Sequence, residues 1–113
     1  MTAENHLAEI QTARQRLQSF GPDNLTSVEL LGLVLGAGKG NELTMALAQR
    51  LLTDHGGLIG LARLNLYELC SEQGIGLARA AQIEATLELG RRMVREAVAD
   101  RPQIMSAADA ARW

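Results

Sequence analysis

The sequence has few of the residues that build disulfides, strands or membrane spans. Its single cysteine, Cys70, excludes a disulfide within the chain and suits a reducing, cytoplasmic location. Only 3% of the residues are aromatic and β-branched residues are few, which argues against an all-β domain. The longest apolar run, residues 30–38, is too short to cross a bilayer, and no basic-then-apolar signal segment opens the chain. We therefore expect no membrane association.

Basic charge is also scarce for a protein that would bind nucleic acid by bulk attraction. The chain has 11 Lys and Arg against 13 Asp and Glu, a net charge of −2 at pH 7. The deficit lies in residues 1–73, whereas residues 74–113 carry a small excess of bases. A domain that binds DNA through its net charge is normally basic. Any nucleic-acid contact must therefore come from a local structural feature, and it should weaken as salt rises.

Leucine and alanine, both strong helix formers, are abundant. The 113 residues fit one domain, and Leu and Ala recur at helical spacing. We predict an all-α fold over residues 1–103, a compact orthogonal bundle of about five to six short helices that contains a helix-hairpin-helix motif. Residues 104–113 are assigned to a following, truncated segment, because Ser106 and Asp109 form a helix-start box near the end of the chain.

Capping boxes and glycine-rich turns mark the ends of the expected helices. Thr26 with Glu29, and Asn65 with Glu68, have the spacing of N-terminal capping boxes. The first three helices are expected to carry Leu7, Ile10 and Leu17 up to Gly21-Pro22, then Thr26 to about Leu35, then Asn41 onward with Leu43, Ala46, Leu47 and Leu51 facing the core. Next are expected one turn over residues 58–62, a short helix from Asn65, and a long helix that buries Ala80, Ile83, Leu87, Val94 and Val98.

The most specific pattern is a glycine turn between the last two helices. Gly74-Ile75-Gly76 is followed by the small Ala80 and the apolar Ile83, which is the helix-hairpin-helix spacing. The glycines permit a tight turn, the central isoleucine fills the angle between the helices, and the alanine lets them cross closely. Unpaired amides and the helix dipole at the start of the long helix favour a phosphate.

This turn supplies the predicted DNA-binding residues. Contacts made by amides read the backbone of DNA rather than its bases. Lys39 reaches a second phosphate or is a solvated loop lysine, and turn carbonyls offer a site for a monovalent cation. A plain glycine turn between packed helices is the structural alternative. The predicted contact residues are Gly74, Ile75, Gly76, Leu77, Ala78, Arg79 and Lys39.

A second stretch resembles this turn at an offset of 38 residues. Gly36-Ala37-Gly38 matches Gly74-Ile75-Gly76, and each follows a short capped helix. The first copy is degenerate, since Gly40 loosens its turn and Glu42 stands where the second copy has Ala80. The likeness indicates either a duplicated unit or chance.

No other cluster of residues predicts chemistry. His6 and His55 are far apart with no ligand spacing, so we expect no metal site. Cys70 lacks a neighbouring histidine and is interpreted as an inert thiol. Glu84, Glu88, Arg91 and Arg92 on the long helix have the spacing of surface ion pairs. Arg91, Arg92 and Arg95 form a small basic cluster that is interpreted as a solvated face, with a second phosphate contact as the alternative. No catalytic constellation is present, so the sequence predicts no enzyme.

Taken together, these stretches resemble the N-terminal helical domain of the RadC family of DNA-repair-associated proteins. The resemblance spans about residues 14 to 92 and rests on Arg14-Gln-Arg-Leu17 with Phe20-Gly21, Leu25-Thr-Ser-Val-Glu-Leu-Leu31, Leu47-Ala-Gln-Arg-Leu-Leu52 with Gly57-Leu58, and Gly74-Ile-Gly-Leu-Ala-Arg-Ala-Ala-Gln-Ile83 with Glu88-Leu-Gly-Arg-Arg92.

The resemblance implies a sequence-nonspecific DNA-binding accessory module. The resemblance also implies a two-domain arrangement, in which this domain is followed by a metal-dependent JAB/MPN-type domain. The His-x-His-Pro and Ser/Asp zinc ligands of that second domain have no counterpart in this sequence. The family usually has an Arg and a Thr-Gly where this chain has Gly36-Ala37-Gly38. That departure, with the acidic charge, keeps open a protein-interaction or structural module that retains the hairpin without binding DNA.

Overall fold

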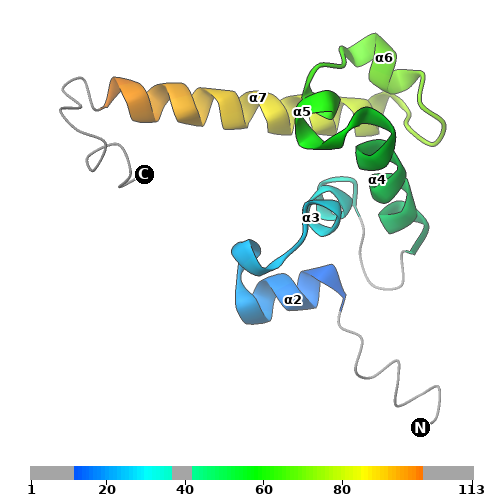
Figure 1. Ribbon diagram of the computed structural model, residues 1–113, viewed down its shortest axis with the longest axis horizontal. Helices are drawn as coiled ribbons and strands as arrows, with labels where there is room; N and C mark the ends of the chain where they lie inside the picture. Colours follow the sequence, from blue (N-terminus) through cyan, green and yellow to red (C-terminus); the bar gives the residue numbers. More distant parts are fainter. Residues whose placement is uncertain (1–11, 37–41, 101–113) are drawn as a thin grey trace, which may run out of the picture.

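The computed structural model describes residues 12–36 and 42–100, and every helix in these ranges is short except the last. No strand occurs in these two ranges, so the all-α expectation is confirmed. The predictions made for Leu7, Ile10, Lys39, Ser106 and Asp109 lie outside the described residues. The elements are α2 (Ala13–Phe20), the 3-10 turn η1 (Pro22–Asn24), α3 (Ser27–Val34), α4 (Glu42–His55), α5 (Gly57–Ala62), α6 (Leu66–Cys70) and α7 (Leu77–Ala99). Figure 1 shows their arrangement, in which α2, α3 and α4 lie below the long last helix and α6 lies above one end of it.

Capping boxes begin three of these helices. The two predicted boxes are confirmed: the amide of Glu29 donates to Thr26 Oγ1 at 3.1 Å, and that of Glu68 donates to Asn65 Oδ1 at 2.8 Å. A third box, which the sequence reading missed, begins α2 at Thr12, whose Oγ1 accepts from the amide of Gln15. Each cap stabilises its helix by about 1 kcal/mol.

The core lies where α3, α4, α5 and α6 meet the first half of α7. Its most deeply buried large side chains are Leu51, Leu61, Leu69 and Ile83. Around them pack Leu31, Leu35, Leu47, Ala48, Leu52, Ile75 and Ala80. Cys70 is half-buried and packs against this cluster, as expected for a thiol that serves as an apolar side chain.

The buried face of α4 differs from the expected one. Leu43 is 86% exposed, and Ala46 is exposed as well, so their predicted inward orientation is wrong. The buried residues repeat at the spacing of a single helix face, which runs through Thr44, Leu47, Ala48, Leu51 and Leu52. Leu47 and Leu51 are buried as predicted, so the observed face keeps these two leucines and includes Thr44 and Ala48 in place of Leu43 and Ala46. A hydrogen bond from Arg79 satisfies the Thr44 hydroxyl and makes its burial possible.

Two glycines and a close contact fold α5 back against the end of α4. Gly56 and Gly57 both have positive φ, of 76° and 88°. At Gly60, a Cβ atom would lie 1.4 Å from the carbonyl oxygen of His55, so only glycine fits there. This corner fixes His55 at the end of α4, close to the loop that follows α6.

The last helix is buried along only its first half. Ala80 and Ile83 are 0% and 1% exposed and Leu87 is half-buried, as expected. Val94 and Val98, however, are 61% and 58% exposed, so the prediction that they share the buried face is wrong. The helix has 23 residues, about 35 Å in length, and in Figure 1 its second half extends past the other helices. None of the described helices has the length and apolar character that a bilayer span requires.

Candidate functional site

The hairpin between α6 and α7 is built as its sequence pattern predicts. Ile75 is 4% exposed and packs in the core with Leu69 and Ala80. Its amide donates to the carbonyl of Glu72 at 3.0 Å, which closes the turn. Gly74 has a φ of +86°, and a Cβ atom there would lie 3.4 Å from Leu47 Cδ1. Ile75 is therefore an anchor of the fold rather than a contact residue, and Gly74 is required by the turn itself.

The fold does not require a glycine at the other glycine position of the turn, Gly76. Gly76 has a φ of −88°, which any residue adopts, and a Cβ atom there would meet nothing within 4 Å. It is the N-cap of α7 and makes no side-chain cap hydrogen bond, unlike Thr12, Thr26 and Asn65 at their helices. The residues around this helix start, Gly76, Leu77 and Ala78, are exposed. The first amides of α7 are therefore open to an external acceptor.

Arg79 folds back onto the turn instead of extending freely into solvent. Its Nη1 donates to the carbonyl oxygen of Gly74 at 3.1 Å, and its Nη2 donates to Thr44 Oγ1 at 3.2 Å. The side chain is half-buried and ties the hairpin to α4. Arg79 thus lies beside the predicted phosphate site, held in place by two neutral oxygen atoms.

A second arginine, which the sequence reading missed, holds the turn from its other side. Arg50 of α4 donates through Nη2 to the carbonyl oxygen of Gln73. It follows Thr44 and Leu47 at three-residue spacing, so all three lie along one side of α4. That spacing was present in the sequence, but nothing local in the sequence shows that this side of α4 meets the hairpin.

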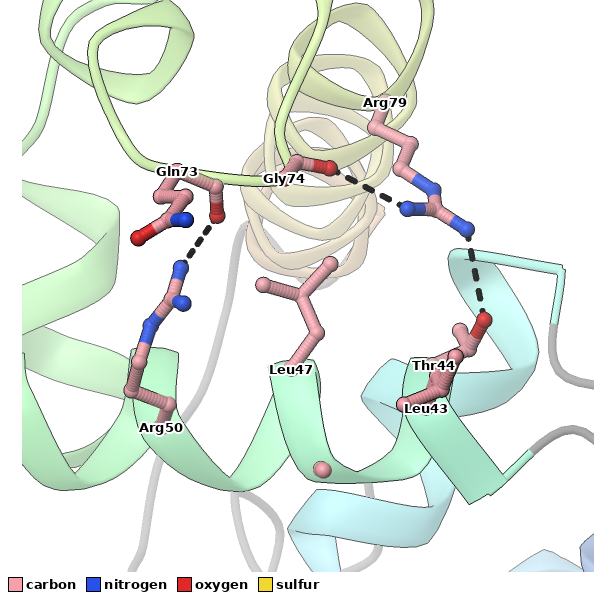
Figure 2. Close-up of a pocket in the computed structure, with 8 residues that line it drawn as sticks. Leu43, Thr44, Leu47, Arg50, Gln73, Gly74 and Arg79 are labelled. Atoms are coloured by element: carbon pink, nitrogen blue, oxygen red, sulfur yellow. Dashed lines mark hydrogen bonds between the residues drawn. The ribbon is translucent and has the colours of Figure 1, made fainter.

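These residues line an open groove of about 570 Å³ between α4 and the turn. Figure 2 shows Leu47 rising toward the turn, with Arg50 on one side and Arg79 on the other. No carboxylate is among the described residues that line it. Two acids adjoin lining residues in the sequence: Glu42 is exposed at the start of α4, and Glu72 is bonded to His55, with 2.5 Å between Oε1 and Nε2. The lining residues are Leu43, Thr44, Ala46, Leu47, Arg50, Gln73, Gly74 and Arg79.

The stretch that resembles the hairpin takes a different register in α4. Gly36 has the positive φ expected of a turn, at 97°, while residues 37–41, and with them Lys39, lie outside the described ranges. Glu42, which the offset of 38 aligned with Ala80, is exposed. Two buried pairs of α4 have the three-residue spacing of Ala80 and Ile83, namely Thr44 with Leu47 and Ala48 with Leu51. They correspond to offsets of 36 and 32, so neither falls at the offset of 38.

The arginines late in α7 are paired with a carboxylate. Arg91, Arg92 and Arg95 donate to Glu88 at 3.0–3.1 Å, which confirms the expected surface ion pairs. Hydrogen bonds from Arg92, Arg91 and Arg95 lower the pKa of Glu88. The second phosphate contact considered for this cluster gains no support from this geometry, since its charge is partly neutralised.

Metal-ligating groups do not gather in the described part of the chain. Over residues 12–36 and 42–100, no three His, Cys, Asp or Glu side chains form a group that could hold a metal ion. The carbonyls of Gln73 and Gly74, which a monovalent cation at the turn would use, accept from Arg50 and Arg79. A cation there would meet two positive charges, and this expectation remains a prediction.

Comparisons with known proteins identify relatives along most of the chain. A model of the UPF0758 N-terminal family matches residues 5–81. A UPF0758 protein of Chloroflexus aurantiacus is 44% identical over 98 residues, 87% of this chain and 43% of the relative. One of Desulfitobacterium hafniense is 44% identical over 105 residues, 93% of this chain and 46% of the relative. One of Bordetella avium is 41% identical over 101 residues, which are 89% of this chain and 45% of the relative. No solved structure matches at a significant level.

Proposed function

Because the chain belongs to the UPF0758 family, which is the RadC-like family, we propose that it is a sequence-nonspecific DNA-binding accessory module. In this proposal a phosphate accepts hydrogen bonds from the amides at the start of α7, next to Gly76, and Arg79 supplies positive charge beside it. Ile75 and Gly74 shape the turn rather than contact the DNA. The module itself catalyses no reaction.

One observation carries this proposal: the turn keeps a glycine that the fold does not need. Gly76 has an ordinary backbone conformation, open space around its Cα, and no cap for the helix that follows. A bare helix start suits the close approach of a phosphate, which would itself cap the unpaired amides. The two arginines beside it are bound to neutral oxygens, so the local charge is positive in a chain of net charge −2.

The rest of the protein would supply any further activity. The chain spans less than half the length of the curated relatives it matches. A C-terminal JAB/MPN-type domain, as the RadC resemblance implies, is the proposed partner in a longer protein. We propose that the module positions such a domain on DNA.

The test is fluorescence anisotropy of labelled duplex, single-stranded and branched DNA at low and raised salt. Saturable binding that weakens with salt is expected, since each neutralised phosphate releases counterions. Gly76→Glu places a carboxylate at the amides and should abolish binding while the fold is retained. Gly90→Glu is the matched control, because it adds the same charge at a glycine that also has open space around it but lies in the second half of α7. Absence of binding at low salt would refute the proposal.

A second candidate function, protein interaction, is favoured by the apolar surface of α7 and the cleft beside it. Leu89, Met93, Val94 and Val98 are each more than half exposed. Near the first half of the helix, an apolar cleft of about 130 Å³ opens between α3, α5 and α7, with Leu30 and Leu58 partly exposed at it. Exposed apolar surface of this kind is typical of contact sites. Sedimentation of the chain, alone and with DNA, separates the two functions.

A further inference from the structure

The groove between α4 and the hairpin turn contains an arginine, Arg50, that the proposed phosphate site at the start of α7 does not use. Arg50 lies across Leu47 from Arg79, and its only hydrogen bond among the described residues goes to the carbonyl of Gln73. A guanidinium group has five N–H donors, so most of the donors of Arg50 remain available. A carbonyl oxygen also leaves the positive charge uncompensated, unlike a carboxylate.

The surroundings keep this charge from being neutralised. No acidic side chain is among the described residues that line the groove, and Glu72, next to Gln73 in the chain, is bonded to His55. The buried Leu47 forms an apolar floor between the arginines, and the exposed Leu43 adds apolar surface next to Thr44. Two uncompensated cations above an apolar floor attract an anion more strongly than cations in open water do.

The spacing of the two cations suits more than one phosphate. Arg79 is bonded to Thr44 and Arg50 lies six residues further along α4, which is about 9 Å along the helix axis. Successive nucleotides of one strand rise by about 3.4 Å each. A single strand of a duplex can therefore offer one phosphate to each arginine.

We propose that the groove binds a second phosphate of the same DNA strand, with Arg50 as its ligand. This inference rests on the proposed function and extends it. The strand would place one phosphate at the start of α7, beside Arg79, and a phosphate about two to three nucleotides along the strand in the groove at Arg50. The second contact adds affinity and fixes the direction in which the backbone crosses the hairpin.

The experiment measures duplex affinity against salt concentration for the full chain and its Arg50→Gln variant. Each lost phosphate contact reduces the slope of log K against log salt by about 0.9. Arg50→Gln should reduce the slope by that amount and weaken binding about tenfold at low salt. Arg92→Gln, with the same change in charge on the far part of α7, should leave the slope unchanged. An unchanged slope for Arg50→Gln overturns this inference and leaves the proposed function intact.

A conservative variant separates phosphate binding by Arg50 from a role of this residue in holding the turn. Arg50→Lys keeps the charge but loses the planar fork that reaches the Gln73 carbonyl. It should keep the salt slope, and thermal unfolding reports whether each variant is folded. If Arg50→Lys is folded but its salt slope is reduced as much as that of Arg50→Gln, Arg50 acts only by holding the turn, and the inference is overturned.

Inorganic tripolyphosphate tests the groove without DNA. Its linked phosphates should shift the side-chain NMR signals of both Arg50 and Arg79, and Arg50→Gln should weaken its binding. If duplex DNA does not bind but tripolyphosphate shifts both signals, the proposed function and this inference about DNA both fail, and the groove is a site for linked phosphates only. If neither ligand binds, both fail.

Discussion

The arginines of this protein fall into two groups that differ in what neutralises them. Arg91, Arg92 and Arg95 on α7 share the carboxylate of Glu88. Arg50 and Arg79 at the hairpin are bonded to carbonyl and hydroxyl oxygens. The first group forms the denser basic cluster in sequence, yet the second presents more available charge. The hydrogen-bond partners of a group of bases, rather than their clustering in the sequence, therefore decide how much of its charge is neutralised.

The largest expected effect comes from removing both groove charges. The double variant Arg50→Gln/Arg79→Gln should weaken duplex binding by about a hundredfold, since hydrogen bonds to charged groups contribute about 1.5–3 kcal/mol each. Arg91→Gln/Arg92→Gln removes the same charge from the other group and should change binding by less than about threefold. Anisotropy titration at one low salt concentration compares them. Equal losses in the two double variants would erase the distinction between the groups.

The two glycines of the turn should separate stability from binding. Gly74→Ala forces a side chain into a positive-φ conformation and should lower the free energy of unfolding by about 1–2 kcal/mol. Gly76→Ala has no such strain, so its stability should change little, while its added methyl group hinders the approach of a phosphate. Urea unfolding measures the first effect and anisotropy the second. Equal destabilisation by both substitutions would contradict this assignment.

Carboxylate pairing should make one part of the fold sensitive to acid. The hydrogen bond from the Thr26 backbone, aided by Arg16, holds the pKa of Glu29 below its usual value of 4.5. A lowered folded-state pKa contributes stability above the unfolded pKa, and this contribution disappears as the pH falls through the folded value. Glu29→Gln can keep the capping box, as Gln15 does in α2, but it removes the negative charge beside Arg16 and at the start of α3, so it should cost about 0.3–1 kcal/mol at pH 7.

That cost should shrink as the pH falls below about 4.5 and should disappear once the pH is below the lowered pKa of the native Glu29 carboxyl group. Urea unfolding of both chains between pH 3 and pH 7 measures the difference. The groove has no carboxylate among its described lining residues, so duplex binding should not change between pH 7 and pH 6. A cost that is constant with pH would show that Glu29 acts through packing alone.

The smallest expected effect tests the neutralised group directly. Glu88→Gln removes the shared partner of Arg91, Arg92 and Arg95 and leaves three exposed cations. Duplex binding at low salt should strengthen by no more than about threefold, through general attraction, and the gain should vanish at raised salt. A gain of tenfold or more would indicate that this cluster contacts DNA once it is released.

Local sequence signals predicted the parts of the fold that depend on neighbours within a few residues. The boxes at Thr26 and Asn65 lie three residues from their partners, and the helix-hairpin-helix spacing correctly placed Ile75, Ala80 and Ile83 in the core. Predictions failed where burial depends on distant elements. Leu43 and Val94 have suitable helical spacing, but no described element covers them.

The candidate site divides in the same way. The sequence by itself determined the turn, its glycines and the bare start of α7, because these depend on backbone conformation and on residues close in the chain. Only the tertiary structure decided that Arg50 belongs to the site, that Thr44 is buried, and that Glu72 is bonded to His55. The contacts join Arg50 to Gln73, Thr44 to Arg79 and His55 to Glu72, which are 23, 35 and 17 residues apart in the sequence. They form only because α4 packs against the hairpin.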